Sequence, residues 1–258
     1  MNALEIPAVA GRWTMDTVRL AGRSVLFLLE CLLYGFVRPF KIRRITEQIL
    51  FIGARSSVII LITGAFAGMV LGLQGYYTLR KFGSEGLLGS AVALSIIREL
   101  GPVLTALMVA GRAGSSMTAE IGIMKITEQI NALEMMAVNP LKFVVSPKLF
   151  AGLISLPLLT AFFDVIGIGG GYLVGVHLLG VNSGSYFGEM IKAVDLADIT
   201  GGFYKSIAFG LVISWVCSFI GYTAEATTEG VASATTNAVV VTSVAILILD
   251  YILTSFLL

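Results

Sequence analysis

Four ionisable residues interrupt strongly apolar stretches of the sequence and are the first candidates for chemistry. Arg98 and Glu99 are expected near the middle of one such stretch, Lys205 in another, and Asp250 about midway along the last. A charged side chain inside a bilayer costs ~2.5–3.5 kcal/mol on insertion scales, so these groups should pair or face water. We predict a Lys205–Asp250 ion pair that either locks helices together or recognises a lipid headgroup. For Glu99, beside the Leu-Gly-Pro break at 100–102, the functional interpretation is favoured.

The motifs of common enzymes are absent from the sequence. No Gly-x-x-x-x-Gly-Lys-Ser/Thr phosphate loop occurs, because the similar run at 111–116 lacks the lysine and a preceding strand. No paired catalytic carboxylates, zincin motif or serine elbow is found. The single histidine, His177, has no second ligand nearby, and Cys31 and Cys217 are far apart in apolar stretches. We therefore expect no catalytic residues, metal or cofactor in this chain.

The composition is that of a membrane protein. Of the 258 residues, 57% are hydrophobic and only 13% are charged, whereas soluble domains carry about a quarter charged residues. The surplus apolar surface needs lipid as its solvent. The net charge of +1 argues against nucleic acid as a partner.

The hydropathy pattern predicts an all-α polytopic membrane protein with five transmembrane helices. An N-terminal region, 1–44, should form an interfacial amphipathic helix over 10–38, because its apolar run at 24–37 is shorter than the ~20 residues that a span needs. The predicted spans are 49–79, 87–110, 149–179, 203–220 and 238–258.

The distribution of basic residues predicts the orientation. The region up to residue 44 carries seven Lys or Arg, and the 111–148 connection carries four. The 180–202 connection has one lysine against three acidic residues, although Arg80 and Lys81 mildly oppose the scheme. By the positive-inside rule, the N-terminus and the 111–148 connection should be cytoplasmic and the C-terminus periplasmic.

The 119–140 segment is the most informative part of the polar connections. Its apolar residues recur at helical spacing, which predicts an amphipathic cytoplasmic helix that ends at Pro140. The pattern alone leaves two interpretations open, docking into a groove on a partner or resting on the membrane surface.

Glycines spaced by four residues mark one face on each of two predicted spans. Such faces allow helix backbones to approach closely, either within one subunit or across a dimer seam. The two sets are Gly64, Gly68 and Gly72, and Gly167, Gly171 and Gly175.

Several of these motifs together resemble one family. The run GxRAGSSxTAEIGxMKxTEQIxALExMxVNP at 111–140, with Gly68-Met-Val-Leu-Gly-Leu-Gln74 and Arg98-Glu-Leu-Gly-Pro102, is similar to MlaE-type permeases of ABC transporters associated with MCE proteins. The resemblance extends from about residue 45 to the C-terminus and implies that residues 45–258 form the permease domain. It implies the bacterial inner membrane as location and phospholipid as substrate.

The same resemblance implies partners and roles. The family assembly is a homodimer with two cytoplasmic ABC ATPases, which bind ATP and Mg. A hexameric periplasmic MCE ring with single transmembrane anchors and often a STAS-domain subunit complete it. The helix matching Glu120–Met136 would couple to the ATPase. The coupling candidates are Glu120, Ile123, Met124, Glu128, Leu133 and Glu134.

The family's central lipid cavity, if present here, has wall candidates on the first two spans. Some share one helix face at i, i+3 and i+7, and others follow on the next span. These candidates are Leu71, Gln74, Tyr77, Thr78, Arg98, Glu99, Leu100 and Leu104.

Two other functions fit the same residues. A proton-coupled secondary lipid transporter would use Glu99 and Asp250 as proton carriers. A non-transporting membrane anchor for the MCE ring would need these charges only for assembly.

Overall fold

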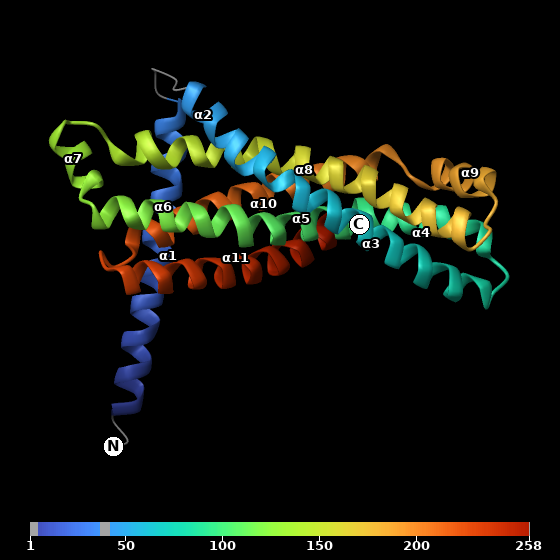
Figure 1. Cartoon of the computed structure of the whole chain (residues 1–258). Coiled ribbons are helices and arrows are strands. Elements are labelled where there is room, and N and C mark those ends of the chain that lie inside the picture. The colour runs from blue at the N-terminus through green and yellow to red at the C-terminus, as the bar shows by residue number, and fades with distance from the viewer. Residues whose placement is uncertain (1–4, 37–41, 258) are drawn as a thin grey trace.

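The described part of the chain is helical throughout. The computed structural model describes residues 5–36 and 42–257, with no strand among them. Residues 37 and 38 of the predicted N-terminal helix, and Leu258 of the last span, lie outside this part. Five segments are long and apolar enough to cross a membrane, which confirms the predicted number, and they run side by side in Figure 1. These segments are Ile42–Arg80, Glu85–Ile126, Leu141–Leu178, Leu196–Thr223 and Thr228–Phe256, here called spans 1 to 5.

Spans 1 to 3 contain π-helical turns, which join shorter helices in spans 1 and 2 and flank one long helix in span 3. Span 1 comprises α2 (Ile42–Ile49), a π turn (Leu50–Ala54) and α3 (Arg55–Arg80). Span 2 comprises a 3-10 turn (Glu85–Leu87), α4 (Leu88–Ser95), a π turn (Ile96–Leu100), α5 (Gly101–Val109), a π turn (Ala110–Gly114) and α6 (Ser115–Ile126). Span 3 comprises a π turn (Leu141–Val145), α8 (Ser146–Tyr172) and a π turn (Leu173–Leu178).

The remaining helices are simpler. Spans 4 and 5 are formed by α10 (Leu196–Thr223) and α11 (Thr228–Leu257), and α1 covers Glu5–Phe36. Two short helices lie at opposite ends of the bundle, α7 (Gln129–Met135) and α9 (Ser183–Ala193). These two ends are called below the α7 end and the α9 end.

The single helix predicted over 119–140 is wrong, because the chain turns twice there. Span 2 continues through α6, and the helix breaks at Glu128, which adopts the left-handed conformation with φ 56°. After α7, Ala137 is also left-handed, and Val138 N–H donates to the Leu133 carbonyl in a Schellman-type end. The result is an elbow, residues 127–139, that projects from the α7 end.

The first helix crosses the bundle instead of running along it. Figure 1 shows α1 (dark blue) passing across the α7 end of the long helices. Trp215 Nε1 donates to the Ser24 carbonyl at 2.8 Å, and Ser146 Oγ donates to the Cys31 carbonyl at 3.0 Å. Burial at this contact raises the pKa of the Cys31 thiol to about 12. A helix that lies across spanning helices has the direction expected of the predicted interfacial helix.

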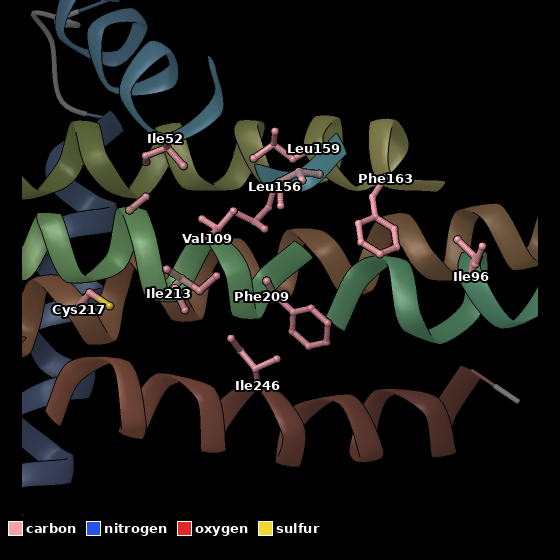
Figure 2. Packing of buried hydrophobic residues seen from close by; sticks show 14 of the residues in the cluster. Ile52, Ile96, Val109, Leu156, Leu159, Phe163, Phe209, Ile213, Cys217 and Ile246 are labelled. Atoms are coloured by element: carbon pink, nitrogen blue, oxygen red, sulfur yellow. The ribbon is translucent and has the colours of Figure 1, made fainter. Parts of the chain in front are cut away.

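A continuous core joins spans 2 to 5. Figure 2 shows Phe163 of α8, Val109 of α5, Phe209 and Ile213 of α10, and Ile246 of α11 directed into the same layer. All five are almost fully buried. These spans therefore share one packed layer of side chains, whose van der Waals contacts contribute to helix association in a bilayer.

Five of the six predicted glycines pack within this chain along the seam between α3 and α8, whereas Gly175 faces Leu88 of α4. A Cβ added at Gly68 would overlap the carbonyl oxygen of Gly167. One added at Gly64 would lie 3.0 Å from the Phe163 carbonyl oxygen, and one at Gly72 would lie 3.0 Å from that of Gly171. The seam is thus a line of backbone contacts that only glycine permits.

Gly68→Ala should weaken this seam. Overpacking of this kind costs about 1–3 kcal/mol, and thermal unfolding of the purified protein in detergent measures it. Gly169→Ala is the matched control, because a Cβ there meets nothing within 4 Å. Equal melting temperatures for the two variants would contradict the close approach at Gly68.

Candidate functional site

The centre of the polar site is the ammonium group of Lys205 on α10. The side chain is only 3% exposed, and its Nζ lies 2.8 Å from Glu99 Oε2 and 3.2 Å from Asp250 Oδ1. The Nζ also donates to Thr254 Oγ1 at 2.7 Å and to the Arg98 carbonyl at 2.9 Å. The predicted Lys205–Asp250 pair is therefore present, and Glu99 is a third member. One cation ties spans 2, 4 and 5 together.

A second ion pair adjoins this cluster. Arg98 Nε lies 2.7 Å from Asp198 Oδ1. The other carboxylate oxygen of Asp198 accepts from the Asp195 backbone N–H at 3.0 Å, in a capping box that begins α10. Hence the carboxylate that fixes Arg98 also fixes the start of span 4.

The site lies nearer the α9 end than the sequence predicts. Span 2 extends from Glu85 to Ile126, so Arg98 and Glu99 fall in the third of the span nearest α9 instead of at its middle. Asp250 is likewise six residues before the end of span 5 at Phe256, and not midway along it. This difference arises because each helix continues beyond the apolar run from which its span was predicted.

The local sequence explains how two adjacent charges both reach partners. The π turn Ile96–Leu100 contains Arg98 and Glu99, and Pro102 opens α5 directly after it. Proline removes a backbone donor, and a π turn changes the direction of successive side chains relative to a regular α-helix. Arg98 therefore meets the start of α10 while Glu99 meets Lys205.

A separate cavity of about 300 Å³ lies between α3 and α4. Three predicted wall residues, Leu71, Gln74 and Thr78, line it on the α3 side. The other lining residues are Gly75, Leu79, Ala91, Val92 and Ser95. Apolar walls with a few polar groups are suited to acyl chains held near a polar end.

The other predicted wall residues lie elsewhere. Tyr77 is 54% exposed and is not among the lining residues. Arg98 and Glu99 line a smaller cavity of about 40 Å³ beside Lys205. Leu100 and Leu104 are half-buried, and Leu104 packs against the core. Of the eight predicted wall residues, three line the cavity, two belong to the charge cluster, and Tyr77, Leu100 and Leu104 line neither.

The predicted coupling residues are distributed around α6 and the elbow. Ile123, Glu128 and Glu134 are exposed, whereas Met124 and Leu133 are half-buried. Glu120 is exposed but forms an ion pair with the nearly fully buried Lys148. Two further exposed apolar residues of the elbow are Met135 and Met136.

Asp198, Thr254 and Lys148 are the functional-site residues that sequence reasoning missed. The Asp-x-x-Asp spacing at 195–198 resembles a capping box, so the sequence pattern could have identified Asp198 as part of the start of a helix. Thr254 follows Asp250 by four residues and so shares its helix face. No local pattern identifies Lys148, whose carboxylate partner is distant in sequence.

Lys205→Met should destabilise the bundle strongly. The substitution leaves the Glu99 and Asp250 carboxylates close together without their shared cation, and removal of one member of a buried pair costs about 3–5 kcal/mol. Thermal unfolding in detergent checks this, with Lys192→Met as control. Lys192 forms an exposed pair with Glu189, and such pairs contribute about 0–1 kcal/mol. Similar losses in both variants would show that the cluster does not hold the spans.

Comparison with known proteins is consistent with this architecture. The family described as Permease MlaE matches residues 45–256. The chain is 47% identical to the intermembrane phospholipid transport system permease protein MlaE of Haemophilus influenzae, with 96% of this chain and 95% of that protein covered. It is 39% identical to a probable ABC transporter permease protein of Rickettsia typhi, covering 98% of both.

A plant protein extends the range of relatives. The chain is 31% identical to the chloroplastic protein TRIGALACTOSYLDIACYLGLYCEROL 1 of Arabidopsis thaliana, with 92% of this chain and 66% of that protein covered. The match across nearly the whole chain, together with five spans and the motifs on spans 1 and 2, means that the chain belongs to the MlaE permease family.

Proposed function

We propose that the chain is the membrane-spanning subunit of an ATP-driven phospholipid transporter of the bacterial inner membrane. The observation that carries this proposal is the 47% identity to a permease whose name specifies intermembrane phospholipid transport. Because the sequence has no phosphate loop, a separate ATPase chain binds ATP and Mg. The chain itself supplies the path for the lipid.

The cavity between α3 and α4 is the proposed lipid site. Leu71, Leu79 and Val92 offer apolar contact, and Gln74 and Ser95 offer hydrogen-bonding groups. A volume of about 300 Å³ accommodates part of a phospholipid. The remainder of the lipid would contact the bilayer or a second copy of the chain, in line with the homodimer that the family resemblance implies.

The proposed orientation puts the α7 end in the cytoplasm. Arg43 and Arg44 begin span 1 at this end, and Lys125 and Lys142 lie on either side of the elbow, in keeping with the positive-inside rule. The connection with α9 has more acidic than basic residues. The C-terminus, at the other end of span 5, is then periplasmic, where the MCE ring is proposed to receive or deliver lipid.

The elbow is the proposed contact with the ATPase. Exposed apolar and acidic side chains lie there together, including Glu128 and Met135, and Ile123 is exposed on α6 just before the elbow. Closure of the ATPase dimer on ATP would move this surface and alter the cavity. A STAS-domain subunit, where present, would act on the ATPase side.

The decisive experiment is lipid transfer by the complex purified from its native membrane and reconstituted into vesicles. We expect transfer of fluorescent phospholipid that needs ATP. Leu71→Trp, which fills the cavity, should reduce the rate by at least about tenfold. Val70→Trp is the control, because Val70 is exposed on α3 and does not line the cavity.

Other results would favour the alternatives. Transfer by the isolated chain under a pH gradient alone would identify a proton-coupled transporter. No transfer under any condition, with the MCE protein still bound, would identify an anchor.

A further inference from the structure

Lys148, at the α7 end of span 3, is a buried lysine whose charge is compensated from another span. Its side chain is 1% exposed, and its Nζ donates to Glu120 Oε2 of α6. The same Nζ lies 3.5 Å from Gln48 Oε1 of α2. A buried ammonium group requires such partners, because it loses its hydration. One side chain therefore connects α2, α6 and α8, the helices that end spans 1, 2 and 3 at this end.

Lys148 adds a polar contact among helices that already share neighbours. The backbone of α2 packs on α8, and α6 and α8 both pack on α10, so the direct link between α6 and α8 is made by the Glu120–Lys148 side chains. Near Lys148, Ile121 of α6 and Leu149 of α8 belong to one apolar cluster. The Glu120–Lys148 pair is the polar link across this meeting point.

A continuous path leads from this link to the cavity. The elbow follows α6 directly, so movement of the elbow displaces Glu120. Lys148 belongs to α8, which contacts α3 through the glycine seam at Gly68 and Gly167. Further along α3, Gln74 lines the cavity. The path thus combines continuity along α6, α8 and α3 with two contacts between elements, the Glu120–Lys148 pair and the close approach of Gly68 to Gly167.

There is space for the link to change its geometry. A cavity of about 70 Å³ adjoins it, lined by Arg44, Glu47, Gln48, Glu120, Met124 and Lys148 among others. This volume has room for about two water molecules. Rearrangement of the pair therefore need not force the surrounding helices apart.

We propose that the Glu120–Lys148 pair, supported by Gln48, is the joint that transmits movement of the elbow to the α3–α8 unit and so to the lipid cavity. Glu120 then has an internal positioning role, in place of the direct contact with the ATPase expected from sequence. This inference rests on the proposed function, since it assigns the transmission step of the same transporter.

The test measures phospholipid transferred per ATP hydrolysed by the reconstituted complex. In Lys148→Met, Glu120 loses its partner but reaches water, since its side chain is 46% exposed. We expect assembly and ATP hydrolysis to persist while transfer per ATP falls by about tenfold. The charge-reversed double variant Glu120→Lys, Lys148→Glu should recover most of this ratio. Lys192→Met, which removes an exposed ion pair on α9, should leave the ratio unchanged.

Each outcome has a distinct meaning. If the wild-type complex transfers lipid with ATP and Lys148→Met keeps the same ratio, the joint is refuted while the proposed function stands. If the wild type transfers nothing, the proposed function itself fails. If Lys148→Met does not assemble, Glu120→Gln decides by the same ratio: an unchanged value refutes the joint and a reduced value supports it.

Discussion

A lysine ammonium group cannot remain unpaired among apolar helices, and this constraint is met at both ends of the bundle. Lys205, 3% exposed, is held by Glu99 and Asp250 near the α9 end. Lys148, 1% exposed, is held by Glu120 at the α7 end. Each pairing joins different spans, so the charges determine which helices stay together. Apolar burial alone does not specify this, because lipid tails solvate apolar side chains equally well.

Between the two charged sites, the glycine seam makes α3 and α8 behave as one unit. At Gly68 and Gly167 the backbones of α3 and α8 are in direct contact, with no side chain between the two helices. The cavity lies on the side of α3 that faces α4, and the Lys205 cluster lies beyond Ser95 on the same span as α4. A lipid in the cavity would thus have a rigid wall on one side and, on the other, a span that carries the charge cluster. This arrangement suits a path whose width changes when span 2 moves.

The sequence predicts the features that depend on composition and period. Five spans follow from apolar runs, and the Lys205–Asp250 pair follows from the rarity of intramembrane charge. It does not predict features that depend on irregular backbone. The π turn at 96–100 points the adjacent side chains of Arg98 and Glu99 toward different partners. The left-handed Glu128 divides the helix predicted over 119–140. The left-handed Glu128 has no residue signature, since left-handed glutamate is uncommon, and Pro102 marks a break after residue 100 without specifying a π turn.

The central claim is that phospholipid passes through the cavity between α3 and α4 when the partner ATPase turns over. A photo-crosslinking amino acid at Gln74, in the reconstituted complex, tests this most directly, with the same group at Val70 for comparison. Val70 is exposed on α3 and does not line the cavity. We expect a phospholipid adduct at Gln74 whose yield changes with ATP, and an adduct at Val70 whose yield does not. Equal, ATP-independent yields at both positions would contradict passage of lipid through this cavity.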